Sequence, residues 1–267
     1  MKPVKNGIPQ GFLISLILAF FYSVGLLDIF ETLTNPIKIP ENHAYNYPTH
    51  VSILIYVDNG KLTVSSQSID TNNFILAKAY QLVDQWLYLA GLSLDKDKRE
   101  LMHYTRRKRN KTSSHINHTN HDGTTSTILV GSTICWLEVH FDCKLLYNYH
   151  VTKMVVKAEN AVACISMLAN TVWGVLHYYL CLLYHIYILP IITYASAVWW
   201  TGKQKHIQIL NKVRNKVLHL ICAAFCITPT HALELEVSIP PLSLYLDSLT
   251  RHTAIHFNKL GTNNSIL

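Results

Sequence analysis

The pattern of apolar and polar positions predicts a β-hairpin and a helix early in the chain. HVSILIYV (50–57) is β-branched and apolar, DNG follows it, and KLTVSS (61–66) supplies a second extended run. An Asn-Gly pair between two such runs is typical of tight hairpins, so we predict a turn at Asn59–Gly60. Residues 74–90 then carry apolar side chains at helical spacing, and Gly91 follows them as a helix stop signal.

Further along, short strand patterns give way to long helical ones. RELMHYT (99–105), TILV (127–130) and WLEVHFD (136–142) are strand candidates, and a solvated loop is expected from Arg106 to about Ser126. After Asn148, apolar residues recur at helical spacing through 150–174, 175–200 and 205–225. The fold class that follows is α/β (α+β), with β-hairpins over residues 1–144 and an all-helical part over residues 145–267.

Charge changes this picture by pointing to a polyanionic partner. The chain of 267 residues has a formal net charge of +7 and 15 histidines. Such a balance favours nucleic acid or an anionic membrane face as a partner. Six cysteines without framework spacing lie mostly in apolar patterns, and we expect buried, reduced thiols.

Two uncharged segments open a membrane interpretation. Residues 12–27, FLISLILAFFYSVGLL, follow Lys2 and Lys5 and resemble a signal peptide. Residues 175–200 form a longer apolar segment that contains His177, His185 and Pro190. Only 15% of the residues are charged, against roughly 25% in an average soluble domain. A small membrane protein therefore stays open as an alternative function.

A series of segments along the chain carries a family resemblance: GIPQG (7–11), YVDN (56–59), GLSLDKDKRELMHYT (91–105), WLEVHFD (136–142), ILPIITYASAVWW and TPTHALELEVSIPPLSLYLD. They resemble, in family order, segments of the reverse transcriptases of LINE-type (non-LTR) retrotransposons, and most closely those of fungal genomes. GIPQG (7–11) with FLISLIL resembles the segment beneath the templating base, and YVDN (56–59) resembles the Tyr-x-Asp-Asp hairpin. GLSLDKDKRELMHYT (91–105) resembles the segment that follows, and WLEVHFD resembles the Tyr-Leu-Gly strand of the primer grip. ILPIITYASAVWW and TPTHALELEVSIPPLSLYLD resemble the thumb and connecting region.

The resemblance implies the carboxyl-terminal part of a polymerase domain: a partial palm over 1–144 and a helical thumb and connection over 145–267. It implies RNA-directed DNA synthesis on an RNA template and a DNA primer, with deoxynucleotides and Mg²⁺. Asp58 would then hold metal, and Lys98 would lie near the phosphates of the incoming nucleotide. Contacts to nucleotide and template would come from a further set of residues: Pro9, Gln10, Gly11 and Tyr56.

Departures from the family pattern predict an inactive chain. Asn59 stands where the family has a second aspartate, and the upstream aspartate's segment is expected several dozen residues before Gly7. One carboxylate cannot hold two magnesium ions against their hydration. Phe12, Asn59 and Glu138 stand for serine, aspartate and glycine, and each arises by a single C-to-T change on one DNA strand. Such decay also explains the signal-like run, so we expect a cytoplasmic or nuclear protein without membrane insertion.

Other features give weaker indications of a binding or metal site. The run Arg106, Arg107, Lys108 and Arg109 is either a phosphate contact or a solvated loop. The spaced histidines His115, His118 and His121 lack the cysteine or carboxylate partners of a zinc site. Trp199 and Trp200 are expected to pack between helices. A nucleic-acid-binding remnant without catalysis is the second alternative.

Overall fold

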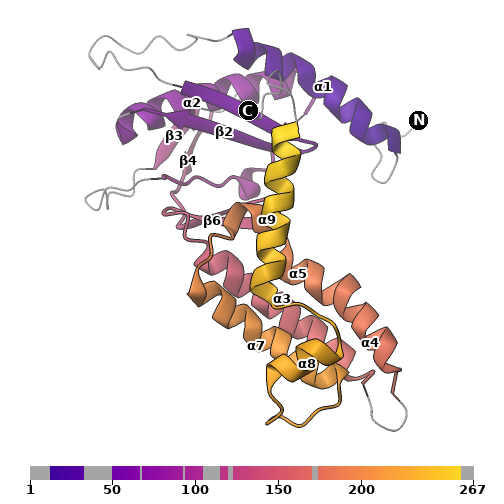
Figure 1. Cartoon of the computed structure of the whole chain (residues 1–267). Coiled ribbons are helices and arrows are strands. Elements are labelled where there is room, and N and C mark those ends of the chain that lie inside the picture. Colours follow the sequence, from indigo (N-terminus) through magenta and orange to yellow (C-terminus); the bar gives the residue numbers. More distant parts are fainter. Residues whose placement is uncertain are drawn as a thin grey trace. The chain divides into compact units, whose positions relative to one another are not determined.

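The computed structural model describes residues 13–32, 50–66, 68–92, 94–104, 115–119, 123–169 and 174–259. It shows a mixed α+β protein with small two-stranded sheets (Figure 1), which confirms the predicted class at this level. The chain divides into two compact units, unit 1 (Met1–Glu138) and unit 2 (Val139–Leu267). Their assignment to a palm and a thumb stays a prediction.

Unit 1 contains a hairpin and a long amphipathic helix. Strands β1 (His50–Tyr56) and β2 (Asn59–Ser65) pair antiparallel, α1 (Leu13–Thr32) packs near β1, and α2 (Ile69–Leu89) packs against β2. Helix α2 buries Ile75, Ala79 and Val83 on one face. It ends at Ala90, and Gly91 follows with a positive φ of 73°, as the helix stop signal predicts.

The predicted solvated loop is wrong at its carboxyl-terminal end. Residues Ile116–Thr119 form β3, which pairs antiparallel with β4 (Thr125–Ile128), and α2 packs against β3. Ile116 and His118 are buried and alternate with exposed residues, so a period of two is present. Histidine is classed as a polar residue, so the alternation of buried and exposed positions in this strand was not visible in the sequence. The strand predicted over 99–105 is reduced to a bridge between Leu101 and Val130 after the short helix η1 (Lys96–Lys98).

The strand predicted over 136–142 is also wrong, because a turn interrupts it. Strand β5 (Thr133–Trp136) ends before this turn and β6 (Val139–Asp142) begins after it, and the division between the units falls in the turn. Leu137 and Glu138 both have positive φ values, 48° and 63°. A left-handed backbone conformation interrupts an extended strand, and it is unfavourable for residues other than glycine.

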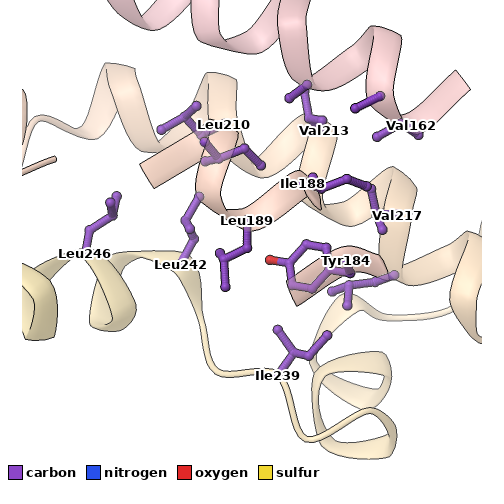
Figure 2. Close-up of a cluster of buried hydrophobic side chains, with 14 of the residues drawn as sticks. Val162, Tyr184, Ile188, Leu189, Leu210, Val213, Val217, Ile239, Leu242 and Leu246 are labelled. Carbon is purple, nitrogen blue, oxygen red and sulfur yellow. The ribbon is translucent and has the colours of Figure 1, made fainter. Parts of the chain in front are cut away.

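Unit 2 is a helical bundle. Its elements are α3 (Asn148–Ser166), α4 (His177–Leu183), the π-helical segment η2 (Tyr184–Ile188), α5 (Leu189–Thr193), α6 (Ser196–Trp199), α7 (Gln204–Ile221), α8 (Thr230–Glu236) and α9 (Leu242–Lys259). Figure 2 shows their apolar side chains gathered in one core, with Val162 from α3, Val213 from α7 and Leu242 from α9. Trp199 and Trp200 are buried at 0% and 8% exposure, as predicted.

A buried arginine joins three segments of that core. Arg214 of α7 is 2% exposed, and its guanidinium donates to the Glu234 carboxylate of α8. It also donates to the backbone carbonyls of Ile239 and Pro240, at 3.1 and 2.7 Å. The arginine thereby satisfies carbonyls in the turn between α8 and α9, where no regular hydrogen bonding is available.

Two sequence expectations concern apolar segments and thiols. Among the described residues, one helix, His177–Trp199, has the length and composition to cross a membrane, a property that core helices of soluble proteins share. Its inward face is buried through Leu180, Tyr184 and Ile188, which have 4% exposure or less. The expected burial of the cysteines is wrong, because Cys181 and Cys222 are only partly buried and the other four are exposed: Cys135, Cys143, Cys164 and Cys226.

Candidate functional site

The β1–β2 hairpin presents Asp58 in its turn. Tyr56 pairs with Asn59, so Val57 and Asp58 form the turn, and the predicted turn at Asn59–Gly60 is wrong. A turn at Asn59–Gly60 would pair Ile53 with Ser66 and would draw residues up to Ile69 into the strand. Ile69 is instead the first residue of α2, and Ser68 is its N-cap. Helix α2 therefore fixes the register of the hairpin.

The turn stores backbone strain beside the candidate metal ligand. Val57 has a φ of 57°, which is unfavourable for a β-branched residue. Asp58 is exposed, and its carboxylate accepts a hydrogen bond of 3.1 Å from the Asn59 side-chain amide. Tyr56 is 58% exposed at the end of β1. The turn therefore offers one carboxylate and one neutral amide to the solvent.

These groups do not fit a pair of magnesium ions. Two divalent ions in a phosphoryl-transfer site require several carboxylate oxygens at close range. Within the ranges that the structure describes, no group of three or more His, Cys, Asp and Glu side chains can hold a metal ion. No catalytic step through a metal is therefore assigned to Asp58.

Lys98 lies in a local ion pair on the surface. Its ammonium lies 3.3 Å from the Asp95 carboxylate, and its side chain is 83% exposed. The Asp95 carboxylate also accepts from the Asp97 backbone N–H at 3.1 Å, which caps η1. These two hydrogen bonds, that of Asp97 first, lower the pKa of Asp95. An exposed pair of this kind contributes little to stability, and its lysine is accessible to an anionic ligand.

Two sets of predicted contact residues lie outside the described residues. They are the nucleotide and template set Pro9, Gln10 and Gly11, and the basic run Arg106, Arg107, Lys108 and Arg109.

A half-buried polar cluster in unit 1 has no counterpart among the sites predicted from the sequence. One Arg99 guanidinium nitrogen lies 2.9 Å from the Tyr80 hydroxyl oxygen and 2.9 Å from the His118 Nε2. The rings of Tyr80 and His118 meet edge to face at 4.3 Å, and burial raises the pKa of Tyr80. Because a guanidinium only donates, His118 accepts at Nε2 and carries its proton on Nδ1. This histidine therefore supports the packing of α2 against β3, and its Nε2 is engaged by Arg99.

Two buried histidines flank Trp199 in unit 2. His150 of α3 and His206 of α7 lie with their ring centroids 6.0 and 6.2 Å from that of Trp199. The His206 Nε2 donates to the Asn148 side-chain carbonyl at 3.0 Å, and the His140 backbone N–H donates to the His150 Nδ1 at 3.4 Å. Burial lowers the pKa of His150 to about 4 and also lowers that of His206. Both imidazoles are therefore neutral at physiological pH.

Helix α7 carries the basic surface that the structure adds to the sequence expectations. Its exposed lysines Lys205, Lys212 and Lys216 stand at positions i, i+7 and i+11, and hence on one face; we call them the lysine row. The opposite face packs into the core through residues such as Leu210 and Val217. Helix α7 contains no acidic residue. The sequence signal was this spacing, which is weaker to the eye than the contiguous basic run after Thr105.

The lysine row spans about 16 Å along the helix axis. Unit 2 contributes ten Lys and Arg against five Asp and Glu, a net charge of +5. Ammonium groups placed in a row along one helix face match the repeating phosphates of a nucleic-acid strand better than they match one small anion. The row is therefore a candidate interface for a nucleic-acid backbone.

Comparisons of the chain with protein-family models, with curated proteins and with solved structures found no match.

Proposed function

We propose that this chain corresponds to the carboxyl-terminal part of a LINE-type reverse-transcriptase domain that no longer polymerises and still binds nucleic-acid backbone. The observation that carries the binding function is the lysine row on α7, which packs into the bundle on its opposite face. The binding is electrostatic and independent of base sequence, because lysine ammonium groups contact phosphates as point charges.

One backbone feature supports the reverse-transcriptase origin. Glu138 stands where the resembled primer-grip motif has glycine, and its φ is 63°. Glycine adopts this conformation without the steric cost that a Cβ atom brings, roughly 1–2 kcal/mol. A position whose geometry favours glycine and whose side chain is glutamate fits a motif that lost its glycine by mutation.

The hairpin supports the loss of catalysis. The resembled family places two adjacent aspartates at this tip, and here Asn59 follows Asp58 and donates to its carboxylate. The amide neutralises none of the charge of a metal ion, and it occupies one lone pair of the only carboxylate in the turn. Catalysis by two-metal phosphoryl transfer would require a set of ligands that the described residues do not bring together.

A binding experiment with three chains tests the proposal. Fluorescence anisotropy with a labelled single-stranded RNA compares the wild type, a row variant and a charge-matched control. The row variant is K205Q/K212Q/K216Q, and the control removes three lysines outside α7 that have no assigned role, as K61Q/K78Q/K259Q. We expect the row variant to lose about tenfold or more in affinity at low salt, and the control to lose less. Equal losses in both variants would assign the binding to net charge alone and overturn the role of α7.

Primer extension tests the catalytic part separately. The wild-type chain with an RNA template, a DNA primer, deoxynucleotides and Mg²⁺ is expected to add no nucleotide above background. Extension that disappears in the Asp58→Asn variant would contradict the proposed loss of activity.

A further inference from the structure

The helical part of unit 2 has two chemically different ends. Helices α3 and α7 lie side by side with their amino ends together, since the Asn148 carbonyl of α3 accepts from His206 of α7. At the other end, the Val175 N–H donates to the Leu168 carbonyl at 2.9 Å, which brings the chain before α4 to the end of α3. Helix α4 packs against α7 as well. The end of α3, the start of α4 and the end of α7 therefore lie at one end of the bundle.

The last turns of α3 and α7 and the whole of α4 carry no charged side chain. Residues 160–202 contain no Lys, Arg, Asp or Glu, and residues 217–233 contain none either. The lysines of α3 and α7 precede these stretches, and the last of them, Lys216, lies about one and a half turns before the end of α7. This end of α3, α4 and α7 therefore has no charged side chain of its own. The lysines of α7 lie on one side of it, and Glu236 of α8 is close enough to Cys222 to raise further the pKa of its thiol, which burial already raises.

Large apolar side chains are exposed at this uncharged end. Phe225 and Ile227, in the turn after α7, are 83% and 88% exposed. Met167 at the end of α3 is 77% exposed, and Leu176 before α4 is 71% exposed. Two tyrosines of the first turn of α4 complete the surface, which we call the apolar end: Met167, Leu176, Tyr178, Tyr179, Phe225 and Ile227. Side chains of this size exposed together mark an interaction surface.

We propose that the apolar end docks unit 2 onto a lipid surface. Phe225 and Ile227 would enter the boundary between headgroups and acyl chains, and the tyrosines would lie at headgroup level, where an apolar ring with a polar hydroxyl is favoured. Lys216 supplies the positive charge that anionic headgroups attract. The chain lies on the membrane and does not span it, because the inward face of α4 and η2 is part of the protein core.

The charge distribution favours a lipid surface over a second copy of the chain. Two copies that met at their apolar ends would bring together two units with a net charge of +5 each. An anionic bilayer is complementary to the same charge. The inference rests on unit 2 alone and is independent of nucleic-acid binding.

Vesicle flotation with the full chain tests the proposal. Vesicles of phosphatidylcholine alone and of phosphatidylcholine with phosphatidylserine are each mixed with the wild type, with F225S/I227S and with the control L54S/L129S. The control removes two apolar side chains of unit 1 that are 58% and 76% exposed. Circular dichroism verifies that each variant retains the helical content of the wild type. Alkaline extraction of the floated fraction distinguishes docking from insertion.

We expect the wild type and the control to float, more strongly with phosphatidylserine, and to be released by alkaline extraction. F225S/I227S is expected to partition about tenfold less. The proposal is overturned if the wild type stays in the soluble fraction with both vesicles, or if F225S/I227S floats as well as the wild type. Sedimentation of a wild-type dimer that F225S/I227S abolishes, without flotation, would assign the surface to a second copy and refute lipid docking.

Discussion

Acidification from pH 8 to pH 5 is expected to destabilise unit 2 through the buried imidazole of His150. The side chain is fully buried, and burial is the main cause that lowers its pKa to about 4 from 6.5. His140 and Lys157 also lower the pKa of His150, and the backbone of Tyr194 opposes them. Between these two pKa values the unfolded chain binds a proton that the folded chain excludes, so stability falls as the pH decreases.

The magnitude follows from the two pKa values of His150. At pH 8 the imidazole is neutral in both states and contributes no pH dependence. At pH 5 the unfolded state is mostly protonated while the folded state is mostly neutral, which costs about 2 kcal/mol of unfolding free energy. The loss approaches about 3 kcal/mol below pH 4. His206 adds to the effect in the same direction, because burial also lowers its pKa.

Urea unfolding followed by tryptophan fluorescence at pH 8, 6.5 and 5 measures this dependence. The His150→Asn variant retains an acceptor for the His140 N–H and removes the titrating imidazole. Its loss of unfolding free energy between pH 8 and pH 5 is therefore expected to be about 2 kcal/mol smaller than that of the wild type. His252→Asn, at an exposed position on α9, is the matched control and is expected to follow the wild type. An identical pH dependence in the wild type and His150→Asn would refute the reasoning.

Three further predictions concern the fold and its strained positions. Glu138→Gly is expected to raise stability by about 1 kcal/mol in thermal unfolding by relieving the positive φ, whereas Glu159→Gly in the middle of α3 is expected to lower it by a similar amount. Arg214→Ala is expected to cost about 3–5 kcal/mol in urea unfolding, because it leaves the largely buried carboxylate of Glu234 with only the exposed His231 imidazole of its two partners and removes the donor to the Ile239 and Pro240 carbonyls; a loss under 1 kcal/mol would contradict this role. NMR of the imidazole nitrogens is expected to show neutral His118 protonated at Nδ1, and a proton on Nε2 would contradict its acceptance from Arg99.

Local sequence patterns predicted the elements of this fold better than their ends. The hairpin follows from its β-branched, apolar strand pattern, and the end of α2 follows from Gly91, which adopts a left-handed conformation. The hairpin turn was placed two residues too late, since the start of α2 limits how far β2 extends. Strand β3 was not predicted, because His118 is a polar residue type and yet is buried in the structure. A polar residue enters a core only through partners from distant segments, here Tyr80 and Arg99, and local patterns do not contain them.

The candidate site was predictable only in part for the same reason. The position of Asp58 in a hairpin turn and the neutral amide of Asn59 can be read from four consecutive letters. The ion pair of Lys98 with Asp95 is also local, at a spacing of three residues. The lysine row required knowledge of which face of α7 is buried, which is set by α3 and α9. Tertiary packing thus selects which of several basic segments becomes a continuous exposed surface.

The salt dependence of RNA binding tests the central claim most directly. Three phosphate contacts to single-stranded RNA contribute about −2 to the slope of log K against log salt, which is roughly a 20-fold loss between 50 and 200 mM salt. We predict that the slope of K205Q/K212Q/K216Q is less steep than that of the wild type by about 2, while K61Q/K78Q/K259Q retains most of the wild-type slope. A row variant with the full wild-type slope would show that the lysines of α7 touch no phosphate and would contradict the account.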